Sequence, residues 1–241
     1  MNLWGITHRG VVREENQDAY AVTQLSNRQL LALVCDGMGG ARAGNVASTM
    51  AVEVFMEYFG QLWGQEEFGH EQILEAAAAQ ANLAVYQRSS SDSACYGMGT
   101  TMVAALLDGD RAVILNEGDS RAYHVTPESI SRITRDHSLV EDLVLRGELT
   151  PEQAKNHPNK NLITRALGSE PELRADLFEC DVKQGEFLVL CSDGLSNVVS
   201  DQEILYEVLH GGQPEDCCER LLEIAMKHGA PDNVTVALIE C

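Results

Sequence analysis

The sequence predicts an α+β fold in which antiparallel sheets are covered by pairs of helices. One observation behind this prediction is the order of the elements, which runs strands, two helices, strands, two helices and a final strand. The other is the shortness of the turns between successive strands, because only antiparallel neighbours can be joined in that way. A parallel sheet would need a helical crossover after each strand, and the chain shows no such alternation.

Three strands are predicted near the start of the chain, at residues 3–8, 19–25 and 29–35. The third contains the run LLALVC, which is continuously apolar and therefore predicts a strand buried on both faces. Apolar residues then recur at helical spacing over 47–58 and 74–85, which predicts two amphipathic helices. The polar stretch SSSDSA ends this helical pair.

The rest of the chain repeats the order of strands followed by two helices. Strands are predicted at 100–107, 111–117, 120–125, 129–133, 176–182, 186–192 and 233–240, and helices at 201–210 and 214–228. The polar region 137–165 holds a short helix in HSLVEDLVLRG and a second helix start at Thr150-Pro151. Because no repeat or Pro/Gly/Ser-rich linker interrupts the pattern, we expect residues 1–241 to form a single domain.

The charge of the chain disfavours two classes of partner. The 241 residues include 17 basic and 37 acidic side chains, which gives a net charge of −20. Nucleic acids and anionic membranes are bound through basic surfaces, so we expect neither as a partner. Two explanations of the acidity stay open, because carboxylates confer solubility and can also be gathered to hold cations.

The cysteines indicate a reducing compartment. The chain has seven of them, an odd number, with no C-x-x-C pair. The first 20 residues contain no apolar stretch typical of a signal peptide. No apolar run approaches the about 20 residues that span a bilayer. We therefore expect a cytoplasmic protein.

The dipeptide Asp-Gly occurs three times and provides an internal comparison. Asp108-Gly109 separates two runs of strand character, which is the usual signal of a hairpin turn. Asp36-Gly37 and Asp193-Gly194 are different, because each follows a buried strand and precedes a helix. Asp232 stands before the final strand, and Asp119 lies in a short gap between two strands.

Four aspartates therefore occupy ends of predicted core strands. If those ends converge, the carboxylates cannot all remain ionised at close range without cations. Hard divalent ions with oxygen ligands, Mg²⁺ or Mn²⁺, would compensate their charge. Aspartate is also common at strand ends because it caps helices and forms turns, so spacing alone leaves both explanations open.

Eight motifs occur in order across nearly the whole chain. They are VREENQDA, VCDGMGG, GMGTT, NEGDSRAY, TRDHSLV, NLITRALGS, LCSDGLSN and APDNVTV. Together they resemble the metal-dependent protein phosphatases of the type 2C (PPM) family, and in particular its short bacterial members. The resemblance implies a four-layer α-β-β-α sandwich, which agrees with the predicted order of elements.

The resemblance also implies a metal site. Asp36 would bridge two Mn²⁺ or Mg²⁺ ions, one of which the Gly37 carbonyl would also bind. Asp193 and Asp232 would hold the other ion, and Asp119 would bind a third, weaker ion together with Asp193. The ions would generate hydroxide from water at neutral pH and neutralise the phosphoryl oxygens.

Two further residues receive roles from the resemblance. Arg13 would clamp the substrate phosphate, and Asp18 would lie near the metals and act through waters, although it could equally cap the following strand. The implied reaction is hydrolysis of phosphoserine and phosphothreonine in proteins, opposing cytoplasmic serine/threonine kinases. The implied protein is a monomer. A phosphoprotein-binding pseudophosphatase and a hydrolase of small phosphomonoesters remain alternatives.

Four positions depart from the family pattern. Gln17 stands where many members have glutamate, and Glu117 where valine is usual. Met38 and Ala41 stand where animal and bacterial relatives, respectively, carry a histidine. Since methionine cannot donate a proton, the acid that protonates the leaving group is expected to be a water on a metal, or is unassigned.

Residues 140–165 resemble the family's flap, a mobile segment beside the active site. The alternative is an ordinary surface loop with no role at the site. We expect a flap that selects substrates and takes no part in the chemistry. We expect His137 and His157 to be structural or exposed.

Overall fold

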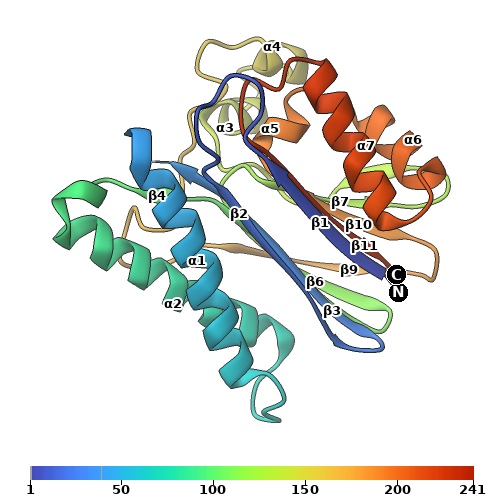
Figure 1. Ribbon diagram of the computed structural model, residues 1–241, viewed down its shortest axis with the longest axis horizontal. Coiled ribbons are helices and arrows are strands. Elements are labelled where there is room, and N and C mark those ends of the chain that lie inside the picture. The colour runs from blue at the N-terminus through green and yellow to red at the C-terminus, as the bar shows by residue number, and fades with distance from the viewer. Residues whose placement is uncertain (1, 39) are drawn as a thin grey trace.

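The computed structural model describes residues 2–38 and 40–241, and it confirms the predicted α+β sandwich (Figure 1). Two antiparallel sheets pack face to face, and helices cover both outer faces. The strands of one sheet, in spatial order, are β2 (Asp18–Ser26), β3 (Gln29–Met38), β5 (Met102–Asp108), β6 (Arg111–Glu117) and β9 (Asp176–Asp181), with β4 (Gly99–Thr100) paired to β3. Those of the other sheet are β1 (Asn2–His8), β11 (Val234–Glu240), β10 (Phe187–Cys191), β7 (Arg121–Val125) and β8 (Ile130–Arg132).

The helices form the two outer layers. α1 (Gly40–Leu62) and α2 (His70–Ser91) cover the sheet that contains β3. α6 (Asp201–His210) and α7 (Pro214–Lys227) cover the sheet that contains β10. In Figure 1 the two helical pairs lie on opposite sides of the sheets.

The run LLALVC is buried on both faces, as predicted. Leu31, Leu33 and Cys35 pack in the core beneath α1 and α2. Leu30 and Val34 point the other way, into the apolar layer between the two sheets. Alternate side chains of one strand thus enter two cores, because successive Cβ atoms point to opposite faces.

Two of the boundaries that differ from the prediction lie beside the candidate site. β3 does not end at Cys35, because Gly37 pairs with Thr100 of β4 and the strand continues to Met38. β10 ends at Cys191, and Asp193 is the first residue of a short helix, α5 (Asp193–Ser196). A one-turn helix, η1 (Ser93–Cys95), follows α2.

The comparison dipeptide behaves as predicted. Asp108 ends β5 and pairs with Arg111 of β6, so Gly109 and Asp110 form the loop of a hairpin, and the φ of Gly109 is 62°. This left-handed conformation favours glycine because a Cβ atom would clash there.

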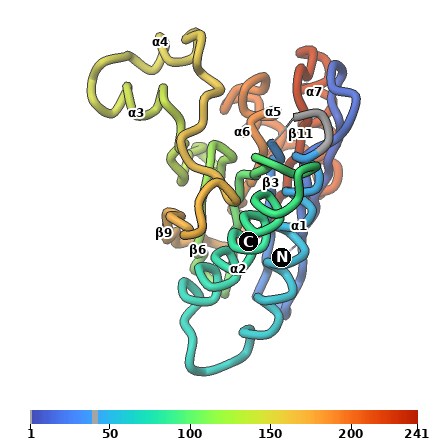
Figure 2. Tube along the Cα trace, turned by 90° about the vertical axis from the view of Figure 1, so that its left-hand side faces the viewer, coloured from blue at the N-terminus to red at the C-terminus, as the bar shows by residue number. Residues whose placement is uncertain are grey.

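The segment between β8 and β9 stands away from the sandwich (Figure 2). It contains α3 (Leu139–Leu145) and α4 (Pro151–Lys155), near the two predicted helix starts. Thr150 caps α4 by accepting a hydrogen bond from the Gln153 N–H group, at 3.2 Å. Among the described residues, no helix is both long and apolar enough to cross a membrane.

Candidate metal centre

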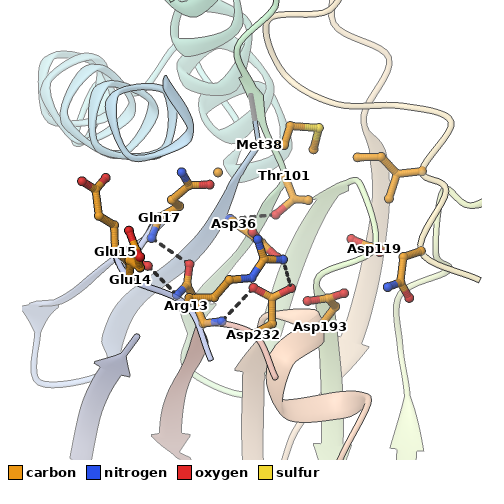
Figure 3. A pocket seen from close by; sticks show the side chains of 14 residues that line it. Arg13, Glu14, Glu15, Gln17, Asp36, Met38, Thr101, Asp119, Asp193 and Asp232 are labelled. Atoms are coloured by element: carbon orange, nitrogen blue, oxygen red, sulfur yellow. Dashed lines mark hydrogen bonds and ion pairs between the residues drawn. The ribbon is translucent and has the colours of Figure 1, made fainter. Parts of the chain in front are cut away.

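Strand ends and loops of both sheets surround one pocket of about 630 Å³. The four aspartates that sequence spacing singled out, Asp36, Asp119, Asp193 and Asp232, all line it. Arg13 lines it too, and Figure 3 shows its side chain reaching across to Asp232. The predicted convergence of the four aspartates on one pocket is therefore what the structure shows.

The backbone of Asp36 is fixed by two threonines. The Asp36 N–H group donates to Thr101 Oγ1, and the Thr101 N–H group donates to the Asp36 carbonyl, both at 2.9 Å. Thr100 Oγ1 donates to the same carbonyl at 2.9 Å. Burial, together with the nearby carboxylates of Asp18 and Asp193, raises the pKa of Asp36 well above its ordinary value.

Asp193 supplies an oxygen with no partner in the protein. Its Oδ2 accepts a hydrogen bond from Asn197 Nδ2 at 3.0 Å, whereas its Oδ1 is buried without a partner. Burial and the Asp232 carboxylate raise its pKa, and Arg121 and Arg13 lower it. Buried oxygens without a partner are rare, so this one is suited to ligate a cation.

Asp119 occupies the turn between β6 and β7. Ser120, beside it, shares a hydroxyl hydrogen bond of 2.7 Å with Thr101, the residue that fixes Asp36. Burial and the Asp193 carboxylate raise the pKa of Asp119 to about 7. Thr101 therefore links the backbone of Asp36 to the residue next to Asp119.

Arg13 forms an ion pair with Asp232. Its Nη2 lies 2.7 Å from Asp232 Oδ2, and the exposed fractions of the two side chains are 53% and 32%. This contact with Asp232 raises the pKa of Arg13. An exposed pair contributes at most about 1 kcal/mol, so Arg13 can exchange this carboxylate for a phosphate at little cost.

Asp18 lies at the start of β2, opposite Asp36, and is buried. Its Oδ2 accepts hydrogen bonds from Ser192 Oγ at 2.8 Å and Thr235 Oγ1 at 2.6 Å; Ser192 directly follows β10, and Thr235 lies in β11 of the other sheet. Burial raises its pKa to about 7, although the two hydroxyls lower it. Its Oδ1 has no partner. The carboxylate thus joins the two sheets next to Asp193.

Gly37 allows a close backbone approach. A Cβ atom at this position would collide with the carbonyl oxygens of Gly44, in α1, and Gln17. The Gly37 N–H group donates to the Gln17 carbonyl at 3.0 Å. Any side chain here would push α1 away from the pocket.

The pocket fits divalent ions in its chemistry but is not a closed cage. Within residues 2–38 and 40–241, no group of three or more His, Cys, Asp or Glu side chains is gathered around one point. The available ligands are all oxygens, which is the donor set that Mn²⁺ and Mg²⁺ prefer.

Several predicted positions have other roles. His137 is buried, accepts a hydrogen bond from the Gly118 N–H group at 3.1 Å and contacts Asp176 at 3.2 Å, so it is structural. Met38 lines the pocket and offers no proton donor. Glu117 is buried, and burial raises its pKa to about 7. The prediction for Ala41 concerns a side chain outside those that the structure describes.

Sequence reasoning did not identify every residue of the pocket. The lining also includes Glu14, Glu15, Asn161, Ile163 and Asn233. Glu14 and Glu15 lie within VREENQDA, and Asn233 directly follows Asp232, so adjacency to motif residues was the available signal.

A family model described as Protein phosphatase 2C matches residues 7–223. The chain belongs to the protein phosphatase 2C family. It is therefore a protein phosphatase by family, and this membership confirms the resemblance read from the eight motifs.

Curated relatives in two bacteria cover almost the whole chain. The serine/threonine phosphatase stp of Listeria monocytogenes serotype 4b (strain F2365) is 38% identical over 238 residues, which cover 97% of this chain and 93% of the relative. The serine/threonine protein phosphatase PstP of Mycobacterium tuberculosis (strain H37Rv) is 37% identical over 234 residues, 96% of this chain and 43% of that longer protein.

Solved structures share the fold. Stp1 from Staphylococcus aureus, a serine/threonine phosphatase, superposes with a TM-score of 0.90 at 34% identity, over 99% of this chain and 94% of that one. The catalytic domain of PstP in complex with 2 manganese ions gives a TM-score of 0.81 at 34% identity, over 98% and 96%.

Proposed function

We propose that this protein hydrolyses phosphoserine and phosphothreonine in proteins, using two divalent ions held in the pocket of Asp36. The observation that carries the proposal is the meeting of four aspartates and Arg13 from both sheets in one pocket. Carboxylates there suit metals, and the guanidinium beside them suits a phosphate. Membership of the family and the activities of its relatives support the same reaction.

In this proposal Asp36 and the Gly37 carbonyl would hold one ion, and Asp36 would also contribute to the second. Asp193 and Asp232 would hold the second ion, and Asp193 with Asp119 would hold a third, weaker one. The unpartnered Oδ1 of Asp193 supports this assignment, as do the two manganese ions described for PstP. Asp18 acts indirectly, because its carboxylate holds Ser192 next to Asp193.

The chain's own residues bind and orient the substrate. The Arg13 guanidinium exchanges Asp232 for the substrate and donates hydrogen bonds to two phosphate oxygens. The ions, when bound, lower the pKa of water and neutralise charge on the phosphoryl group. No protein nucleophile is needed. The physiological setting that we propose is a cytoplasmic monomer that acts on phosphorylated proteins and opposes serine/threonine kinases.

Substitution of two aspartates tests the proposal. Asp36→Ala and Asp193→Asn should each abolish hydrolysis of a phosphothreonine peptide while circular dichroism shows an intact fold. The matched control is Asp108→Asn, because Asp108 is an aspartate at the end of a strand that does not line the pocket. Activity that survives EDTA would refute the proposal. Faster turnover of sugar phosphates than of phosphopeptides would favour a small-molecule substrate instead.

A further inference from the structure

Asn233 is a buried side chain that connects two parts of the pocket wall. It follows Asp232 and is 4% exposed. The segment opposite it is the β1–β2 loop, residues 9–17, which carries Arg13. The chemistry proposed above makes no use of Asn233.

The Asn233 amide makes three hydrogen bonds to this loop. Its Nδ2 donates to the carbonyls of Arg9 and Glu15, each at 2.9 Å. Its Oδ1 accepts from the Gln17 N–H group at 2.8 Å. Arg9 and Glu15 lie on either side of Arg13 in the chain, so one side chain holds both arms of the loop.

The position of Asp232 is maintained by different contacts. The Asn233 backbone N–H group donates to Asp232 Oδ1 at 2.9 Å, and this bond does not depend on the Asn233 side chain. The Asn233 carbonyl lies so close to Gly194 of α5 that a Cβ atom there would collide with it. A truncated side chain would therefore remove these three bonds to the loop and loosen it, while the bond from the Val11 N–H group to the Ala230 carbonyl at 3.0 Å and the backbone next to Asp232 would remain.

We infer that Asn233 is a positioning residue that acts through Arg13: its amide holds the β1–β2 loop so that the guanidinium stays over the pocket. The inference rests on the proposed function, because it assumes that Arg13 binds the substrate phosphate. Asparagine suits this position because it offers two donors and an acceptor on one planar group. Aspartate has the same shape but would place an oxygen against two carbonyl oxygens.

The chain contains a matched control. Asn82 is 2% exposed, and its Nδ2 donates to the carbonyls of Glu170 and Pro171 at 3.0 and 3.2 Å. Its Oδ1 accepts from the Gly168 N–H group at 2.8 Å. This is the bonding pattern of Asn233, in a part of the chain that does not line the pocket. Asn82→Ala therefore measures the effect of losing such a junction on the fold alone.

The kinetic test compares Asn233→Ala with Asn82→Ala at saturating Mn²⁺. Loss of a buried hydrogen-bonded group changes an equilibrium by about tenfold, so Asn233→Ala should raise KM for a phosphothreonine peptide about tenfold. Asn82→Ala should leave KM within about twofold of the wild-type value. It should lower Tm by about as much as Asn233→Ala does. Equal KM values for the two variants would overturn the inference. If Asn233→Ala does not fold, Asn233→Ser, which keeps one donor, replaces it.

A double-mutant cycle separates positioning from a general loss of structure. In an Arg13→Ala background, adding Asn233→Ala should change kcat/KM by less than about twofold, because the residue through which it acts is absent. If the double variant lost kcat/KM by the product of the two single-variant factors, the inference would be overturned. Mn²⁺ affinity, measured by calorimetry, should be unchanged in Asn233→Ala, and a marked fall would mean that Asn233 acts through Asp232 instead.

Amide hydrogen exchange tests the loop independently of activity. Asn233→Ala should increase exchange in residues 9–17, and Asn82→Ala should not. If the wild-type protein proved inactive on phosphopeptides, the proposed function would fail but this result would still stand. Unchanged exchange in the loop would overturn the positioning role itself.

Discussion

Asp18 and Asp36 are opposite each other across β2 and β3, yet their surroundings give them different tasks. Asp36 faces the pocket, whereas Asp18 accepts hydrogen bonds from Ser192, which follows β10, and from Thr235 of β11. Asp18→Ala would leave the buried Ser192 hydroxyl without an acceptor, at a cost of about 1–3 kcal/mol, whereas the Thr235 hydroxyl keeps Thr7 Oγ1 as a partner at 2.7 Å. We expect urea unfolding in EDTA at about pH 5, where the raised pKa keeps the Asp18 carboxyl protonated in the folded state, to show this loss. A variant as stable as the wild type would contradict the bridging role.

Protonation of the same pocket predicts how the metal-free protein responds to pH. Burial raises the pKa of Asp18 and Asp119 to about 7, from 3.8 in the unfolded chain. Between these values the folded state holds protons that the unfolded state releases, so the free energy of unfolding rises as the pH falls from about 7 towards about 5.

Urea titrations in EDTA at about pH 5 and about pH 8 measure this effect. The metal-free protein should be more stable at the lower pH. The double variant Asp18→Asn and Asp119→Asn, which cannot titrate at these positions, should show a smaller difference. If the free energy of unfolding changed equally with pH in the two proteins, Asp18 and Asp119 would not be the groups that titrate.

At this scale the sequence predicted the aspartates but not their partners. Asp36, Asp193 and Asp232 were visible because each stands next to an apolar strand. Ser192 and Thr235 lie 174 and 217 residues from Asp18, and no local pattern links them to it. The junction at Asn233 was missed for the same reason.

At the scale of elements, the segment between β8 and β9 has its two ends fixed and its middle exposed. Ser138 and Ile163 form an isolated bridge at its base, and the Thr164 N–H group donates to the His137 carbonyl at 2.8 Å. Ile163 also lines the pocket. This arrangement supports the proposal that residues 140–165 are a flap that contacts substrates.

Truncation of one flap side chain tests that proposal. Ile163→Ala should raise KM for a phosphothreonine peptide severalfold but leave KM for p-nitrophenyl phosphate unchanged, because only the peptide reaches beyond the phosphate. Leu145→Ala is the matched control, since Leu145 lies in the same segment, is 54% exposed and does not line the pocket. Equal effects on both substrates would contradict a role in selecting substrates.

The element boundaries that were wrong depend on distant chain. Apolar character stops at Cys35, so the pattern ended the strand there, although backbone pairing with Gly99 and Thr100 extends it to Met38. Similarly, Ser192 directs its hydroxyl to Asp18 and Asp193 begins α5. Hydrophobic periodicity reports burial, and it does not report which backbone groups pair.

At the scale of the whole molecule, a net charge of −20 opposes the approach of acidic phosphoproteins. Glu14 and Glu15 add negative charge beside Arg13 in the pocket wall. For a phosphothreonine peptide with acidic neighbours, kcat/KM should rise between about 10 and about 150 mM salt, because screening shortens the reach of this repulsion.

Two comparisons complete that measurement. For a peptide with basic neighbours, kcat/KM should fall over the same range of salt. In the double variant Glu14→Gln and Glu15→Gln, the difference in kcat/KM between the two peptides should be smaller than in the wild type. A steady fall for the acidic peptide would contradict the account.

The layered architecture is the part that the sequence predicted most completely, because it follows from the order of elements and their apolar patterns. What holds the pocket together is long-range bonding between loops and strand ends. The central claim is that these contacts bring the aspartates together to bind divalent ions. Titration with Mn²⁺, followed by the electron paramagnetic resonance signal of the free ion, tests it directly. We predict that the wild-type protein binds at least two ions and that Asp36→Ala loses tight binding; the same stoichiometry and affinity in both proteins would contradict the claim.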